Sequence, residues 1–309
     1  MRRLDRTTTV LAGALLVLLA MGPVLPKWAV FLVTVALAKA LVVLGLLVLM
    51  RAGLVSFGQG LYFALGGYAA GMAAQALGVG DAVPMLLLGT VVAAGAAGLL
   101  GLLLARYRTI FFAMLSLAFS MILYGLLVKS SALGSTDGFN VAPRTVAGLA
   151  IGRGGIYALA VVCSFAAALG LHHLFGSHLG RLAPAIRDNE LRVEYMGASV
   201  RNVVHLYLVL AAALAGLGGG ITALAVGHID PEMAYWTTSG EFVFVAIFGG
   251  TGSPVAPFLA SLLYELIRSY AYEYSPNTWQ MVVGVSMLLV ILFLPGGLWS
   301  AFARRRRAA

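Results

Sequence analysis

Few side chains in this 309-residue chain could do chemistry, and they form no recognised catalytic motif. The single cysteine, Cys163, lies in an apolar segment, so neither a disulfide within the chain nor a cysteine metal site is possible. There is no phosphate-binding GxxxxGK(S/T) loop, no HExxH and no GxSxG. Three of the five histidines cluster at a predicted helix end, where we expect them to interact with the helix dipole: His172, His173 and His178. We therefore expect no catalytic site, no metal and no cofactor.

A charged segment, residues 180–201, lies between two long apolar stretches. It holds four arginines and three acids. Pro184 suits the first turn of a helix over residues 183–197, where its missing N–H is not needed. At 100° per residue the apolar side chains gather in one sector: Ala185, Ile186, Val193 and Met196.

Leu191 and Tyr195 interrupt the polar face of this helix, as in helices that fit the groove of a partner. We predict a docking helix for a soluble protein, and a helix lying on the membrane surface is the alternative. Its candidate contact residues are Pro184, Ile186, Arg187, Glu190, Leu191, Glu194, Tyr195 and Gly197.

Polar residues among glycines mark a second candidate site, within residues 53–75. Glycines this dense weaken a helix, and polar groups at membrane depth need partners or water. We predict a broken helix that lines a pathway, and a helix joined to its neighbours by hydrogen bonds is the alternative. The candidate translocation-pathway residues are Ser56, Gln59, Tyr62, Tyr68 and Glu241.

A second interruption is the sequence GGTGSP at residues 249–254, which follows a short apolar run. Its glycines and proline predict a turn, and short, interrupted apolar segments in both halves of a transporter indicate the permeation site. Nearby, we expect Glu265 to pair with Arg268 three residues later. Lys39 either snorkels or pairs with an acid.

The elements that must position these residues are apolar helices. Hydrophobic residues make up 61% of the chain and charged residues 10%, with a mean hydropathy of +0.98, which excludes a soluble fold. We predict an all-α, polytopic membrane protein in which some spans are short or broken. About 20 apolar residues cross a bilayer, and ten candidate spans are 9–26, 28–50, 53–76, 82–105, 109–128, 155–175, 203–227, 238–250, 254–272 and 279–299.

The basic residues predict the orientation. With both termini in the cytoplasm, fourteen lysines and arginines fall inside and four outside, a strong positive-inside bias. Residues 304–307, all arginine, place the C-terminus inside by themselves. The net charge of +9 thus reflects topology, and we expect no nucleic acid as a partner. A cleaved signal peptide is the alternative for the first span, but Pro23 follows its only small-residue site.

Several motifs resemble one known family, the permease subunits of branched-chain amino acid ABC importers. The resemblance covers residues 45–300. Its motifs are GLVSFGQG at 53–60, GSTDGFN at 134–140, the charged segment 181–197 followed by AAALAGLGGG at 211–220, FGGTGSP at 248–254 and LFLPGGL at 292–298.

The resemblance implies one ten-span permease domain over residues 1–309, in a bacterial inner membrane, with a cytoplasmic coupling loop at 177–202. It also implies four partners: a second related permease, two cytoplasmic ATP-binding subunits that dock on the 183–197 helix, and an external binding protein that presses on loops 129–153 and 228–236. Urea and short-amide permeases share most motifs and remain an alternative. An ion-coupled secondary carrier would need an acid in mid-span, and only Glu241 and Glu265 come close.

Overall fold

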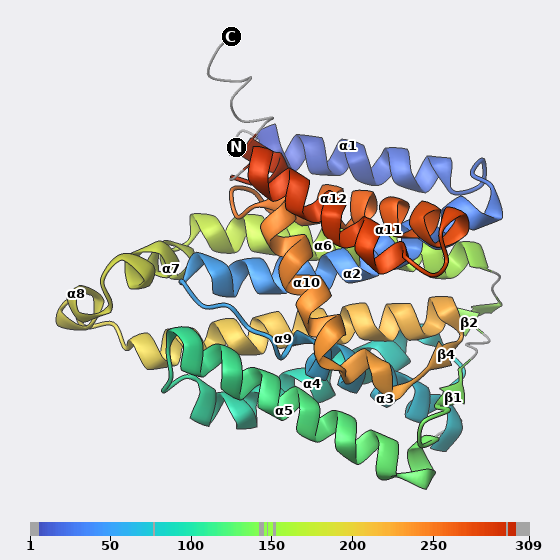
Figure 1. Cartoon of the computed structure of the whole chain (residues 1–309), viewed down its shortest axis with the longest axis horizontal. Helices are drawn as coiled ribbons and strands as arrows, with labels where there is room; N and C mark the ends of the chain where they lie inside the picture. Colours follow the sequence, from blue (N-terminus) through green and yellow to red (C-terminus); the bar gives the residue numbers. More distant parts are fainter. Residues whose placement is uncertain are drawn as a thin grey trace.

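The chain folds into a bundle of helices with two small pairs of strands (Figure 1). A computed structural model describes residues 6–76, 78–141, 145–146, 148–150, 153–294 and 296–300. The helices are α1 (Arg6–Met21), α2 (Lys27–Arg51), α3 (Gln59–Ala76), α4 (Ala82–Leu104), α5 (Thr109–Lys129), α6 (Arg153–Gly176), α7 (His178–Asp188), α8 (Glu190–Tyr195), α9 (Val200–Val226), α10 (Trp236–Gly249), α11 (Ala256–Tyr274) and α12 (Trp279–Phe293). Two 3₁₀ turns, η1 (Ser131–Leu133) and η2 (Pro231–Ala234), and strands β1 (Phe139–Asn140), β2 (Thr145–Val146), β3 (Leu149–Ala150) and β4 (His228–Ile229) complete the described elements.

Each of the ten predicted spans coincides with one helix, and α7 and α8 form the charged segment between α6 and α9. Within the described part of the chain, five helices are long and apolar enough to cross a membrane by themselves: α2, α4, α5, α6 and α9. The all-α polytopic architecture is therefore confirmed, whereas ten crossings stay a prediction.

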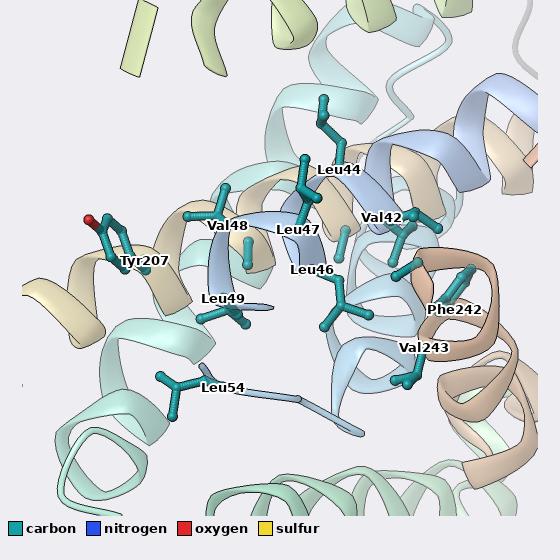
Figure 2. Close-up of a cluster of buried hydrophobic side chains, with 14 of the residues drawn as sticks. Val42, Leu44, Leu46, Leu47, Val48, Leu49, Leu54, Tyr207, Phe242 and Val243 are labelled. Carbon is teal, nitrogen blue, oxygen red and sulfur yellow. The ribbon is translucent and has the colours of Figure 1, made fainter. Parts of the chain in front are cut away.

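Helix α2 occupies the centre of the bundle. Apolar side chains lie on every face of α2, which is the pattern of a helix surrounded by protein. Of the 18 residues in its most apolar stretch, 89% are buried. Figure 2 shows Leu47 and Leu49 of α2 in one cluster with Tyr207 of α9 and Phe242 of α10. The other helices with candidate site residues are thus held against a common rigid core.

Close backbone contacts, which only small residues permit, join the central helices. A Cβ atom added to Gly66 of α3 would overlap the backbone of Gly216 in α9. In a bilayer, where leucine gains little by leaving lipid, such close approach is a main source of helix association.

The two ends of the bundle differ in construction. The end with α7 and α8, called the α8 end below, also carries the α4–α5 turn and the end of α2 (Figure 1). At the opposite end, the strand end, β1 pairs with β4 and β2 pairs with β3. Asp81 caps α4 there by accepting hydrogen bonds from Val83 N and Thr145 Oγ1, both 2.9 Å long.

Candidate functional site

The charged segment projects from the α8 end as two short helices (Figure 1). We expected a single helix over 183–197 with Pro184 in its first turn, and both expectations were wrong. Ser177 starts α7 earlier, by accepting a hydrogen bond from Gly180 N, so Pro184 lies inside the helix. The extended backbone of Asn189 (φ −162°) then breaks the segment, and its side chain caps α8 by accepting from Arg192 N at 3.0 Å.

One face of this segment is anchored to the bundle. Ala183, Ile186 and Val193 are each at most 2% exposed, and the Tyr207 hydroxyl of α9 donates a hydrogen bond to the Leu179 carbonyl. Ile186 was predicted among the contact residues of the docking helix, but it is buried against the bundle and is not part of the exposed face. Of the apolar sector predicted for this segment, Ile186 and Val193 are buried, whereas Met196 is 68% exposed because α8 ends at Tyr195.

The opposite face carries large apolar side chains without cover. Leu191 is 65% exposed and Tyr195 is 90% exposed, as the sequence predicted. Pro184, Arg187, Glu194 and Gly197 are also exposed. Apolar side chains surrounded by charges at a protruding tip suit a protein–protein contact.

An ion pair ties the tip of this segment to the α4–α5 turn. Arg108 Nε lies 2.7 Å from Glu190 Oε1, and the same guanidinium donates to the carbonyls of Ala105 and Tyr107 at 2.7 and 2.8 Å. Glu190, predicted as a contact residue for a partner, thus has a partner within the chain, and the sequence did not indicate Arg108. A separation of 82 residues leaves no local signal for such a pair.

The second candidate site lies where α3 begins. Residues 53–58 are not helical, and α3 starts only at Gln59, about half-way along the neighbouring helices (Figure 1). The predicted break is confirmed. Serines replace the missing helical hydrogen bonds: Phe57 N donates to Ser116 Oγ of α5 at 3.1 Å, and Gly60 N donates to Ser239 Oγ of α10 at 2.9 Å.

The predicted pathway residues of this segment are enclosed. Ser56 and Gln59 are 0% exposed, Tyr62 is 2% and Tyr68 is 4%. Neither amide atom of Gln59 nor the Tyr68 hydroxyl has a hydrogen-bond partner within the described part of the chain. Such buried polar groups are destabilising by about 1–3 kcal/mol each, so a solute or water would gain by contacting them.

Glu241 lies in a different cluster. Lys39 Nζ of α2 is 2.5 Å from Glu241 Oε1 and 2.6 Å from Glu265 Oε1 of α11, and Arg268 lies 3.8 and 3.7 Å from the same two oxygens. The predicted Glu265–Arg268 pair is present, and Lys39 pairs rather than snorkels. Ser239, which binds the start of α3, and Glu241 are about 200° apart around α10. Glu241 therefore lies on the opposite face of α10 from the start of α3, where the predicted pathway residues Ser56 and Gln59 lie.

The strand end joins the two loops predicted to lie outside. Phe139 pairs with Ile229 and Asn140 with His228 in the β1–β4 ladder, and His228 Nδ1 lies 2.9 Å from Asn140 Oδ1. The β1–β4 ladder thus joins the described parts of loops 129–153 and 228–236. In the described residues no group of three or more metal-binding side chains gathers at any of these places.

A broken span, a buried ion cluster and an exposed helical projection are features of transport proteins, and comparison with known families agrees. The family described as "Branched-chain amino acid transport system / permease component" matches residues 28–292. The chain belongs to this permease family. It is a multi-pass transport permease of the inner membrane type.

Curated relatives of this permease have similar descriptions. The high-affinity branched-chain amino acid transport system permease protein LivM of Escherichia coli is 26% identical over 313 residues, which cover 92% of this chain and 73% of LivM. BraD of Pseudomonas aeruginosa is 28% identical and LivH of Escherichia coli 25% identical, each over 123 residues and 40% of both chains. No solved structure matches the permease significantly.

Proposed function

We propose that this permease is one membrane-spanning subunit of an ATP-driven importer for branched-chain or related amino acids. The observation that carries the proposal is the exposed helical projection, because a permease driven by separate ATP-binding subunits needs a docking surface of this kind, whereas an ion-coupled carrier does not. The solute class follows from the similarity to LivM, BraD and LivH, which are permease proteins of high-affinity branched-chain amino acid transport systems.

In this proposal the projection is the coupling segment, within loop 177–202 of a single permease domain. One of two cytoplasmic ATP-binding subunits receives Leu191 and Tyr195 in a groove, and the other docks on a second related permease. Hydrolysis belongs to those ATP-binding subunits. The anchored face, through Ile186 and Val193, would transmit their movement to α9.

The proposed orientation places the α8 end in the cytoplasm. Basic residues are more frequent on the elements of that end than at the strand end, where the described ones are Lys27 at the start of α2, Lys129 at the end of α5 and Arg153 at the start of α6. The α8-end arginines are Arg51, Arg106, Arg108, Arg181, Arg187, Arg192 and Arg201. This distribution supports cytoplasmic termini, although residues 1–5 and 301–309, with the terminal arginine clusters, lie outside the described residues.

The strand end would then receive an external solute-binding protein. The described parts of its loops are joined by the β1–β4 ladder. The pathway would run past the start of α3, where Ser56, Gln59 and Tyr62 lie, and then past Tyr68 farther along α3. Glu241 is paired with both Lys39 and Arg268. Two neighbouring cations hold a carboxylate in its charged form, which does not suit an acid that must take up and release protons in an ion-coupled carrier.

Copurification tests this proposal. An affinity-tagged copy of the chain, expressed from its own operon, should retain an ATP-binding subunit and a second permease. Vesicles with the complex should take up a branched-chain amino acid only with ATP and the cognate binding protein. Uptake of urea or a short amide in its place would move the permease to that solute class, and ATP-independent uptake would contradict the importer assignment.

A further inference from the structure

Two adjoining cavities on the α1–α6–α11 side take no part in the proposed transport function. The first has a volume of about 330 Å³ and lies among α1, α2, α6 and α11. All but one of its lining residues are apolar, and they include Leu15, Leu37, Ala168 and Phe258. The cavity is therefore a slot for hydrocarbon.

The second cavity is polar and lies at the α8 end. Its volume is about 900 Å³, and it is lined by the ends of α2 and α6, the α10–α11 turn and Trp299. Arg51, His172 and His173 are its basic side chains. The Arg51 guanidinium carbon lies over the Phe175 ring, 4.1 Å from the ring centroid. This cation–π contact holds the guanidinium at the cavity and leaves its N–H groups able to donate hydrogen bonds.

The two cavities share their walls. Ala168 lines the apolar cavity and His172 lines the polar one, and four residues of helix separate them by about 6 Å. On the other wall, Pro254 lines the polar cavity and the next residue, Val255, lines the apolar one. A single molecule that extends along α6 could thus occupy both.

The shape and charge of the pair fit an amphiphile with an anionic head. A soluble anion would leave the apolar slot empty, and an acidic side chain of a soluble protein is too short to reach down α6 into it. Basic pockets between spanning helices at the cytoplasmic surface suit phosphate head groups, and a volume of about 900 Å³ lies within the range of specific ligand sites. Trp299 on the wall is the type of side chain enriched at membrane interfaces.

We propose that these two cavities form a binding site for one anionic phospholipid. Its phosphate lies beside Arg51 and His173, and one acyl chain lies between α1, α6 and α11. This site does not depend on which solute the permease transports.

Native mass spectrometry of the purified full-length chain tests the proposal. Protein stripped of lipid in detergent is titrated with phosphatidylglycerol or with phosphatidylcholine of the same acyl chains. We expect one phosphatidylglycerol to bind about fivefold more tightly than phosphatidylcholine, the effect of about one well-placed cation. Arg51→Gln should abolish that difference. Arg201→Gln makes the same charge change at the α8 end outside both cavities, and should preserve it.

Variants that fill the apolar slot test the second half of the site. Ala168→Phe should weaken the binding of both lipids, and Leu15→Phe, at a less buried position, repeats the test if Ala168→Phe fails to fold.

Equal binding of the two lipids, or unchanged binding by Arg51→Gln, would overturn the site. Inorganic phosphate that displaces the lipid while the slot variants have no effect would show a soluble-anion site instead. Loss of the bound lipid when the second permease assembles would assign the slot to a partner helix.

Discussion

Gly53 lies directly against the side chain of Arg187. A Cβ atom at Gly53 would be 3.2 Å from Arg187 Cγ and 3.5 Å from Arg187 Cβ. Gly53 begins the non-helical stretch that leads to α3, and Arg187 is on α7 of the exposed projection. The proposed coupling segment therefore touches the broken span through a backbone position where no side chain fits.

Gly53→Ala should weaken the link between the projection and the broken span. The positive φ of +78° strains any L side chain, and the added methyl group presses on Arg187, so we expect a loss of about 1–2 kcal/mol in unfolding free energy and less uptake per ATP hydrolysed. Gly78→Ala has a similar φ of +65° with no atom within 4 Å. If both variants lose equal stability and coupling, the contact with Arg187 is unimportant.

The paired substitution Leu191→Asp/Tyr195→Asp should separate ATP hydrolysis from transport. Both side chains are exposed, so the chain should insert normally, but unpaired charge would enter the partner's groove and lower coupled uptake about tenfold or more. Uptake and hydrolysis are measured in vesicles. Val193→Asp, two residues from each of them but only 1% exposed, should instead destabilise the chain. Normal uptake by the paired variant would rule out the docking assignment.

Lys39→Met should destabilise the bundle strongly. It removes the cation nearest to two buried carboxylates and leaves only Arg268, at 3.7 and 3.8 Å, so we expect the unfolding free energy to fall by about 3 kcal/mol. Thermal unfolding in detergent measures the change. The triple variant Lys39→Met/Glu241→Gln/Glu265→Gln should recover most of it, and Lys129→Met, at an exposed position, should do nothing. Failure of the triple variant to recover would mean that lysine packing, not charge, matters.

Single cysteines test the pathway in a Cys163→Ser background. Ser56 and Gln59 are fully buried, so cysteines there should resist a small aqueous thiol reagent in the isolated permease. In the assembled importer, nucleotide should make them reactive, since the partner ATPases change which state is populated. Tyr62→Cys should follow them, whereas Ala73→Cys should stay protected throughout. Protection of all positions in every nucleotide state would move the pathway elsewhere.

Apolar periodicity and length were enough to predict every long helix, because each depends on local composition. The breaks at residues 53–58 and 249–254 were also predictable, since glycine and proline act on their own backbone. The same reasoning failed at Asn189: a helix break from one capping side chain competes with good helix formers on both sides, and the sequence does not show which effect is larger.

Contacts between distant segments were beyond prediction. Lys39 and Glu241 are 202 residues apart, and Arg108 and Glu190 are 82 apart; only the packing of α2, α10 and the α4–α5 turn brings them together. A buried lysine within a span did indicate that some acid must be near. The lysine did not indicate which acid this would be, nor that Glu241 would lie on the face of α10 opposite Ser56 and Gln59.

Helix α10 is attached to neighbouring helices on two opposite faces. Ser239 fixes it to the start of α3, and Glu241, on the reverse side, fixes it to α2 and α11. The helix cannot roll or slide without releasing one attachment, and the two differ in kind: a neutral hydrogen bond is exchanged readily for another, whereas a buried charge pair is not. Release of α10 from the start of α3 therefore costs less than its release from α2 and α11, and it would occur where the enclosed polar groups lie.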